Sequence, residues 1–359
     1  MRIAQIAPLW ERVPPPGYGG VELVVGLLTD ELVRRGHEVT LFASGDSITL
    51  ARLESVYPRA FRLEPSISEY SAYETLQISR VYKQAANFDV IHSHVGYSSL
   101  FHASFVETPT VHTLHGAFNS DTKKVFAEAR EQFYVSISDA QREPFKELNY
   151  AGTVYNGIDT ESHRFYAQPD STPYLAFLGR ISPEKGTHIA IEIAKKSGVP
   201  LKMAGKVDRV DVDYFESEIK PHIDGKHIEY LGEANHFEKN ALLGGARAML
   251  FPITWREPFG LVMTESMAAG TPVIAKPLGS VPEVIADGKT GFLCDSVDDF
   301  VNAIQRLPEI DRSECRAHVE DKFSIKSMVD GYLDVYRQVM RSKFEKNGYP
   351  RFLANLLMR

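Results

Sequence analysis

The chain of 359 residues is 43% hydrophobic and 24% charged, and its formal net charge is −7 at pH 7. This length and composition predict a globular protein of about two domains. The acidic balance disfavours a general nucleic-acid binder, which is normally basic, although it leaves room for a local basic pocket for a small anion. The two cysteines, Cys294 and Cys315, form no CxxC pair, so a reducing compartment fits better than a disulfide-stabilised scaffold.

No stretch of the sequence approaches the roughly 20 consecutive apolar residues that span a bilayer. Near the start, Gln5 and Glu11 bracket an apolar run that is too short for the hydrophobic region of a signal peptide. We therefore expect a soluble, cytoplasmic protein whose membrane contact is at most peripheral.

Short apolar runs alternate with helix-length segments through the first half of the chain. Apolar residues recur at helical spacing over Gly19–Arg35, which predicts a helix that Gly36 ends. Buried strands are expected at Ile3–Ala7, Glu38–Ala43, Asp89–Ser93, Thr110–Leu114 and Tyr134–Ile137. This alternation predicts a parallel sheet with helices on both sides.

The same alternation restarts near Tyr174, after a polar segment, Asp159–Pro173, that we expect to be a linker. A helix is expected over Thr187–Ser197, and strands at Tyr174–Leu178, Leu201–Ala204, His227–Tyr230, Ala248–Phe251 and Thr271–Ile274. The prediction is therefore an α/β protein of two sheet domains that face each other across a cleft. Ligands of such sheets bind beyond the carboxyl ends of the strands.

The end of the chain allows two interpretations. Apolar residues at helical spacing predict a helix over Lys326–Arg341, and Ser342–Arg359 mixes basic with large apolar side chains. Such a mixture is typical of an interfacial membrane helix. A terminal helix that packs across the domains is favoured, because Gly348 and Pro350 interrupt the pattern.

A glycine-rich loop, Pro14–Glu22, follows the first strand and opens the first helix. The free N–H groups at such a helix start suit an anion, so Gly19 and Gly20 are candidate phosphate contacts. The loop is neither a GxGxxG fingerprint nor a P-loop. A flexible turn that uses glycine for its backbone freedom is an equally good interpretation of this loop taken alone.

Two cations lie on the loop that follows the strand ending at Gly179. Arg180 and Lys185 are suited to a diphosphate, because arginine binds bidentately and lysine adds a mobile charge. The alternative is a solvated surface loop. The position at the carboxyl end of a strand favours the functional interpretation.

Two acids eight residues apart, Glu257 and Glu265, bracket the start of a predicted helix. The amides of Gly260, Leu261 and Val262 would face an anion at that helix start. Acids near a helix start are also favourable for stability alone. Beside a bound anion, these two carboxylates are better suited to the hydroxyls of a sugar and a ribose.

Four histidines, His92, His94, His112 and His115, fall within 24 residues. A metal site would need their strands to be adjacent and their faces matched, and we expect no metal. His115, just past a strand end, is the best candidate for the cleft, with a structural histidine as the alternative. Asp211-Val-Asp213 is a DxD sequence, but polar residues precede it where a buried strand should be, so we discount it as a metal site.

Taken together and in this order, these clusters resemble the retaining glycosyltransferases of family 4, which have the GT-B fold. The matching residues cover nearly the whole chain: Gly19-Gly20, Asn156–Asp159, Gly179-Arg180, Lys185-Gly186, Glu257, Glu265, Ala269–Val273, Gly279–Glu283 and Asp287–Phe292. The resemblance implies two Rossmann-like domains, residues 1–160 for the acceptor and 161–325 for the nucleotide sugar. Residues 326–359 would form a helix that crosses back to the first domain, plus a tail.

The resemblance also implies roles for individual residues. The donor diphosphate would be bound by Gly19, Gly20, Arg180, Lys185, Gly260, Leu261 and Val262. Glu265 would hold the nucleotide ribose, Glu257 would contact hydroxyls of the transferred sugar, and His115 would approach the sugar ring. Gly205 and Lys206 lie where the base would stack or bond.

The implied reaction moves a hexose from a nucleotide-diphosphate sugar to an acceptor hydroxyl with retention of configuration. Arg180, Lys185, Glu257 and His115 would carry it without a metal or other cofactor. Preorganised cations act where negative charge grows on the leaving diphosphate. Attack on the same face is preferred over a double displacement, because no carboxylate is clearly placed as a nucleophile.

Other functions remain open at this point. A nucleotide-sugar 2-epimerase shares the two-domain architecture, and a non-catalytic nucleotide-sugar-binding subunit would keep the fold without turnover. The complete set of four charged residues, Arg180, Lys185, Glu257 and Glu265, argues against the latter. An NAD-dependent dehydrogenase is disfavoured because the first strand lacks a following GxGxxG.

The frequency of donors in the family ranks UDP-glucose first and GDP-mannose next. Trp10, Tyr18 and Tyr97 are the candidate acceptor-binding residues. The opening Ala7–Gly20 looks like that of bacterial proteins assigned as pterin glucosyltransferases, and a lipid or a growing polysaccharide is the alternative acceptor. Nucleic acid is not an expected partner.

Overall fold

The computed structural model describes residues 1–17 and 19–346. It divides into two compact units. Within the described residues, the first unit contains Met1–Pro15, Gly19–Gly157 and residues 325–346, and the second contains residues 16–17 and Ile158–Ser324. The chain therefore leaves the first unit after Gly157 and returns to it at Ile325.

In the described chain, the first unit is built on a seven-stranded sheet in the order β3-β2-β1-β4-β5-β6-β7. All neighbouring strands are parallel. The strands are β1 (Arg2–Ile6), β2 (Glu38–Phe42), β3 (Arg52–Glu54), β4 (Val90–Ser93), β5 (Thr110–Leu114), β6 (Phe133–Ser136) and β7 (Tyr150–Thr153). The chain builds outward from β1 to β3 and then starts again on the other side of β1, so the order reverses between β1 and β4.

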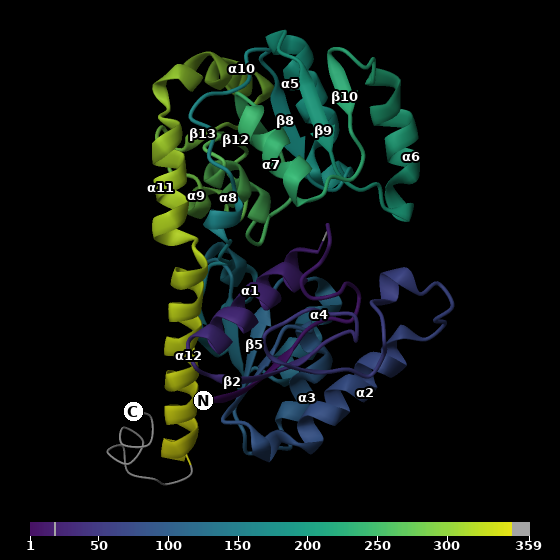
Figure 1. Ribbon diagram of the computed structural model, residues 1–359, viewed down its shortest axis with the longest axis vertical. Helices are drawn as coiled ribbons and strands as arrows, with labels where there is room; N and C mark the ends of the chain where they lie inside the picture. Colours follow the sequence, from purple (N-terminus) through teal and green to yellow (C-terminus); the bar gives the residue numbers. More distant parts are fainter. Residues whose placement is uncertain (18, 347–359) are drawn as a thin grey trace. The chain divides into compact units, whose positions relative to one another are not determined.

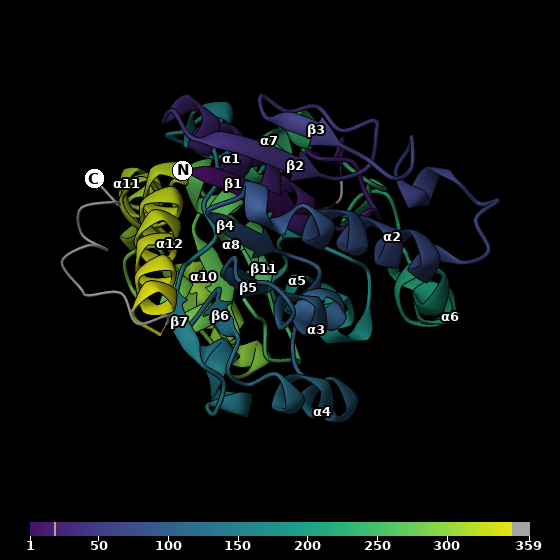
Figure 2. The same ribbon diagram turned by 90° about the horizontal axis from the view of Figure 1, so that it is seen from below.

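Helices cover both faces of this sheet, as Figure 2 shows. They are α1 (Gly20–Arg34), α2 (Tyr70–Lys83), α3 (Leu100–Ala103), α4 (Ser120–Glu128) and α12 (Ile325–Lys346). Because side chains alternate along a strand, Ala4 and Ile6 of β1 enter one core with Ile78 of α2. Gln5, between them, faces the opposite side and hydrogen-bonds Tyr336 of α12.

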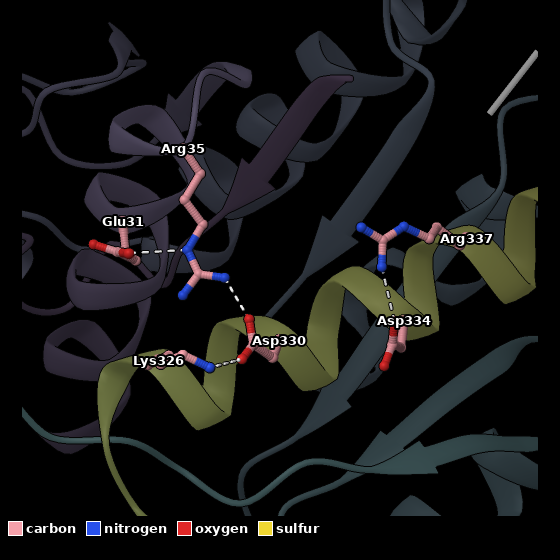
Figure 3. Close-up of polar contacts among 6 residues, drawn as sticks. All are labelled: Glu31, Arg35, Lys326, Asp330, Asp334 and Arg337. Carbon is pink, nitrogen blue, oxygen red and sulfur yellow. Dashed lines mark hydrogen bonds and ion pairs between the residues drawn. The ribbon is translucent and has the colours of Figure 1, made fainter. Parts of the chain in front are cut away.

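The helix α12 is held in the first unit by both apolar and charged contacts. Its buried residues are Met328, Val329, Tyr332, Leu333, Val335, Tyr336, Val339 and Met340. At the end of α1, Arg35 lies 2.9 Å from Glu31 and 2.5 Å from Asp330 of α12, and Lys326 lies 2.7 Å from the same Asp330 (Figure 3). The apolar face predicted for this helix is thus buried against the N-terminal sheet.

The tail that raised the membrane interpretation extends past Lys346, and its interrupting residues Gly348 and Pro350 lie outside the described residues. Within residues 1–17 and 19–346, none of the helices combines the length and the apolar character needed to cross a bilayer.

The second unit, coloured teal to yellow-green in Figure 1, has a six-stranded sheet in its described residues, in the order β10-β9-β8-β11-β12-β13. All neighbouring strands are again parallel. The strands are β8 (Leu175–Leu178), β9 (Leu201–Ala204), β10 (Ile228–Tyr230), β11 (Ala248–Phe251), β12 (Val273–Ala275) and β13 (Gly291–Leu293). Here the order reverses between β8 and β11.

The helices of the second unit form two layers. One contains α5 and α10, which contact each other, and the other contains α7, α8 and α11, of which α8 contacts both neighbours. The helices are α5 (Thr187–Ser197), α6 (Val212–Tyr214), α7 (His236–Gly245), α8 (Leu261–Ala268), α9 (Val281–Val284), α10 (Val297–Arg306) and α11 (Arg312–Lys322). Both units are parallel Rossmann-like α/β layers, as the sequence predicts.

The segment Asp159–Pro173, expected to be a linker, is instead part of the second unit. The N–H of Tyr166 donates to the carbonyl of Ala269 at 3.0 Å, and that of Asp170 donates to the carbonyl of Gly245 at 2.9 Å. Its polar composition hid these backbone bonds, which tie it to the ends of α8 and α7.

Candidate functional site

The candidate residues of the second unit gather where its strand order reverses. Arg180 and Lys185 follow β8, Lys206 follows β9, and Glu257 follows β11. These three strands are the central neighbours β9-β8-β11 of the sheet. The carboxyl ends of strands at such a reversal form a crevice in which open α/β sheets bind ligands.

The loops after β8 and β9 lie against each other. A Cβ on Gly205 would come 1.7 Å from the carbonyl oxygen of Gly179, so only glycine fits there. This close approach brings Arg180 and Lys206 to one carboxylate, because Asp208 lies 3.6 Å from the guanidinium and 2.5 Å from the ammonium.

Arg180 has further acidic partners. It pairs with Glu184 and lies 3.8 Å from Asp211, and its side chain is 31% exposed. The predicted diphosphate contact is therefore a partly exposed cation that three carboxylates surround. The DxD aspartate Asp211 acts here as one of these partners.

Lys185 and Glu257, which are 72 residues apart in sequence, form an ion pair. Lys185 Nζ lies 2.5 Å from Glu257 Oε2, and the Trp255 indole donates to the same oxygen at 3.0 Å. The ammonium also lies 4.7 Å from the centre of the Trp255 ring. Gly186 turns the chain after Lys185 with a φ of +73°, and a Cβ there would come 2.0 Å from the Pro252 carbonyl oxygen.

The start of α8 lies directly beside Glu257. Gly260 caps it in the left-handed region with a φ of +81°, and a Cβ on Gly260 would come 3.3 Å from Glu257 Cγ. The first N–H groups of a helix have no partner within it, so those of Leu261 and Val262 face out of this start. Ser280 holds the preceding loop, since its N–H donates to the Glu257 carbonyl at 2.9 Å and its hydroxyl to the Phe259 carbonyl at 2.9 Å.

Glu265 lies in the second turn of α8 and is nearly buried. Lys239 of α7 donates to its carboxylate at 2.9 Å, and the two side chains are only 5% and 18% exposed. Sequence reasoning missed Lys239, because nothing distinguishes this lysine from its neighbours on α7 until the helices are packed together.

The candidate histidine of the first unit also lies next to the reversal of its sheet. His115 Nε2 lies 2.8 Å from His94 Nδ1, and His94 Nε2 lies 3.0 Å from Gln5 Oε1 of β1. Burial lowers the pKa of His115 to about 4 and holds the pKa of His94 well below its ordinary value, so both rings are neutral at pH 7.

Two of the four histidines fall outside this pair. His92 bonds Tyr336 and Thr113 on the same face of the sheet, whereas His112 points to the other face, toward Ser99. Among the residues that the structure describes, no three histidine, cysteine or acidic side chains are arranged to hold a metal ion.

The side chain of Glu22 lies beside Gly19 in the glycine-rich loop, where the sequence predicts a phosphate. Gly19 precedes α1 with a φ of +146°, and a Cβ there would come 3.3 Å from a carboxylate oxygen of Glu22. Burial raises the pKa of Glu22 to about 7, although the nearby backbone N–H groups of Glu22 and Glu11 act to lower it. The helix start at Gly19 and Gly20 therefore already has an acidic side chain of the protein beside it.

The candidate acceptor-binding residues are exposed and lie on different elements. Trp10 is 46% exposed and packs edge-on against Tyr70 of α2, with ring centres 5.3 Å apart. Tyr97 is 48% exposed and packs edge-on against Phe126 of α4, at 6.5 Å. Tyr18 lies outside the described residues.

Two family models and many curated proteins match the chain. Residues 18–162 match Glycosyltransferase Family 4, and residues 159–322 match Glycosyl transferases group 1. N-acetyl-alpha-D-glucosaminyl L-malate synthase of Bacillus anthracis is 29% identical, over 93% of this chain and 97% of the relative. Phosphatidyl-myo-inositol mannosyltransferase of Mycobacterium leprae is 28% identical, over 83% and 84%.

Solved structures share the whole architecture. HepE from Anabaena in complex with UDP and glucose aligns with a TM-score of 0.71 at 19% identity, over 93% of this chain and 98% of that one. Sucrose-phosphate synthase from Thermosynechococcus elongatus aligns with a TM-score of 0.77 at 18% identity, over 95% and 99%. The consecutive family matches and this shared fold lead to one assignment: the chain belongs to the family 4, group 1 glycosyltransferases with the GT-B fold and is itself a glycosyltransferase.

Proposed function

We propose that this glycosyltransferase moves a hexose, in first place glucose, from a nucleoside-diphosphate sugar to an acceptor hydroxyl with retention of configuration. One observation supports this most strongly. Arg180 and Lys185 follow β8 and Lys206 follows β9, next to the point where the strand order of the second unit reverses, and Arg180 and Lys206 share Asp208. Three cations in such a crevice are suited to a diphosphate.

The donor diphosphate replaces carboxylates as the partner of these cations. In the ligand-free chain Lys185 is paired with Glu257, and Arg180 with Glu184, Asp208 and Asp211. When the diphosphate takes the cations, Glu257 is released to accept hydrogen bonds from sugar hydroxyls. The amides of Leu261 and Val262 add donors that cannot move, and we assign Glu265 to the ribose.

Charge development explains how these groups accelerate transfer. The bond between the anomeric carbon and the diphosphate oxygen breaks, and its electron pair stays on the diphosphate. Arg180 and Lys185 stabilise this charge, and each such preorganised donor is typically worth about 3–4 kcal/mol. The acceptor oxygen then bonds the anomeric carbon on the face that the diphosphate leaves, and its proton passes to the departing phosphate. No step requires a metal ion.

The names of the relatives bear on the chemistry of the acceptor. The two curated relatives described above are named for L-malate and phosphatidyl-myo-inositol, so their names favour a hydroxyl on a small acid or a lipid headgroup. A pterin acceptor rests on the opening residues of the sequence alone. We propose that Trp10 and Tyr97, both exposed aromatic side chains of the first unit, contact the acceptor.

The test compares Arg180→Met with a matched control, Arg306→Met. Arg306 also pairs with a carboxylate, Glu309 at 2.8 Å, but it lies in α10, away from the carboxyl ends of β8 and β9. With UDP-glucose and a panel of hydroxyl acceptors, Arg180→Met should lower kcat/KM by about 10²–10³-fold. Arg306→Met should leave it within about twofold.

Near-normal turnover of Arg180→Met would contradict the assignment of the diphosphate site. NMR of the donor incubated without acceptor tests the alternative reaction, because a 2-epimerase would release an isomerised nucleotide sugar. Calorimetry with UDP, GDP and their sugars then identifies the donor.

A further inference from the structure

A continuous chain of hydrogen bonds, buried beyond the half-buried His115, runs from this histidine to the C-terminal helix within the first unit. His115 meets His94 at 2.8 Å, His94 meets Gln5 at 3.0 Å, and Gln5 Nε2 donates to the Tyr336 hydroxyl at 3.1 Å. That hydroxyl continues to His92 Nδ1 at 2.6 Å. Gln5, His92 and Tyr336 are completely buried, and His94 is 3% exposed.

The amide of Gln5 gives this chain its direction. Its oxygen can only accept, so the His94 Nε2 that faces it carries the proton. A neutral imidazole has one N–H, which leaves His94 Nδ1 as an acceptor. The partner nitrogen, His115 Nε2, must therefore be the donor. Tyr336 receives the amide N–H of Gln5 on its other side, so its own hydroxyl is free to donate to His92.

The same logic fixes the remaining nitrogen of His115. With its single proton on Nε2, Nδ1 is an unprotonated acceptor, and it has no hydrogen-bond partner among residues 1–17 and 19–346. Desolvation keeps the ring neutral, since it lowers the pKa of His115 to about 4. A neutral acceptor attracts a hydroxyl group and has no ionic attraction for a phosphate.

The backbone on both sides of His115 is held as well. Gln141 donates to the carbonyls of Leu114 at 2.9 Å and of Gly116 at 3.0 Å, and its own oxygen accepts the Ile137 N–H at 2.9 Å. One buried amide therefore clamps the residues immediately before and after His115, while the histidine chain orients its ring.

We propose that Gln5, His94 and Tyr336 are positioning residues that present His115 in its Nε2–H form, with Nδ1 as the acceptor for a substrate hydroxyl. This inference rests on the proposed function and on the expectation, from the family resemblance, that His115 approaches the ring of the transferred sugar. It adds the identity of the contact: a sugar hydroxyl donates to His115. It also gives the C-terminal helix α12 a role in orienting His115, through the hydroxyl of Tyr336.

The direct test is ¹⁵N NMR of the imidazole nitrogens in the full chain labelled at histidine, at pH 7 and without ligand. The His115 signals are assigned by their loss in His115→Gln. The expected spectrum shows Nε2 protonated and Nδ1 unprotonated. Gln5→Met removes the amide oxygen that accepts from His94 Nε2. His115 should then be protonated on Nδ1, or should be a mixture of the Nδ1–H and Nε2–H forms.

Gln77→Met is the matched control for Gln5→Met. Gln77 is a second buried glutamine of the first unit, 2% exposed, and its amide donates to the carbonyls of Ala7 and Phe42 rather than to a histidine. It should lower stability comparably and leave the His115 signals unchanged. If Gln5→Met folds poorly, Tyr336→Phe removes only the hydroxyl, and Tyr82→Phe, whose hydroxyl bonds Thr110 at 3.3 Å, serves as its control.

Kinetics give the second readout. Gln5→Met should lower kcat/KM for the sugar donor by about tenfold, the lower end of the range seen when residues that orient metal-bound histidines are replaced, while the affinity for UDP alone stays unchanged. A wild-type spectrum with Nδ1 protonated, or His115 signals that Gln5→Met leaves untouched, overturns the inference. Failure to bind any nucleotide sugar would instead refute the proposed function, and the spectra would be unaffected.

Discussion

Replacing Lys185 with methionine removes one charge from a nearly buried ion pair and keeps most of the apolar stem. The ammonium lies 2.5 Å from Glu257, and the two side chains are 20% and 9% exposed. Breaking a buried pair by removing one partner typically costs about 3–5 kcal/mol, because the other charge stays desolvated. Since Glu257 keeps the Trp255 indole at 3.0 Å as a donor, we expect about 3 kcal/mol for Lys185→Met.

The reverse substitution, Glu257→Gln, should cost less. It leaves the more exposed partner, Lys185, on the Trp255 and Phe251 rings at 4.7 and 5.9 Å, and such cation–π contacts are worth about 0.5–1 kcal/mol at exposed sites. We expect about 1–2 kcal/mol. The double variant should be more stable than the sum of the single losses implies, by about 2 kcal/mol, because neither charge is then left unpaired.

The assay uses the tryptophans, of which the chain has two, Trp10 and Trp255. They lie in different units, so a Trp10→Phe background makes fluorescence report on the second unit alone during urea unfolding. The same variants can be unfolded by heat. In a domain of this size, a loss of about 3 kcal/mol in the free energy of unfolding corresponds to a fall in Tm of about 6–12 °C.

Two lysines provide internal comparisons for Lys185→Met. Lys239→Met should behave similarly, since its pair with Glu265 is equally buried. Lys220→Met should cost under about 1 kcal/mol, because Lys220 and Glu216 are 58% and 51% exposed. A Lys185→Met loss no larger than that of Lys220→Met, or strictly additive losses in the double variant, would refute the reasoning.

Two further predictions concern stability. Because burial raises the pKa of Glu22 from 4.5 to about 7, its contribution is fully present below pH 4.5 and is lost as the pH rises through 7. Glu22→Gln should therefore remove a loss of at most about 3 kcal/mol that develops as the pH rises from 4.5 to 7, seen as a smaller Tm difference between pH 4.5 and pH 8.5; an unchanged difference would contradict this. Arg312 is 9% exposed and donates to the carbonyls of Tyr166, Ala246 and Gly244 and to Thr271. Arg312→Lys, which cannot reach all four, should cost about 2–4 kcal/mol in thermal unfolding, more than Arg316→Lys, whose arginine donates to two carbonyls.

The sequence predicted the elements whose signal is local. The expected bounds are confirmed for the strands β5, β9 and β11 and for the helix α5. Each strand is an apolar run and the helix has apolar residues at helical spacing, and glycine, proline or polar residues mark where these elements end. The strands β3, β7 and β13 were missed. Arg52–Glu54 and Tyr150–Thr153 have no buried apolar pattern, and only pairing with β2 and β6 makes them strands.

For the site, the sequence located the charged residues but not their partners. Glycine and helix-start signals indicated that Arg180, Lys185 and Glu257 follow strand ends. The ion pair between Lys185 and Glu257 forms because β8 and β11 are adjacent in the sheet, which the sequence does not show. Gln5 stood out only as a polar residue that interrupts an apolar run. Its role depends on alternation along β1 and on a helix more than 300 residues later, and neither is visible locally.

The return of α12 to the first unit has a consequence for how the chain matures on the ribosome. The N-terminal sheet is synthesised first, yet Gln5 and His92 remain without their buried partner until Tyr336 has emerged. The main segment of the second unit, Ile158–Ser324, is continuous and is complete before that helix is made. Domains usually fold in the order in which they are translated. Here the second unit can fold before the first unit is complete. In a nascent chain stopped at Ser324, the second unit would be folded, whereas the N-terminal sheet would still lack the helix α12.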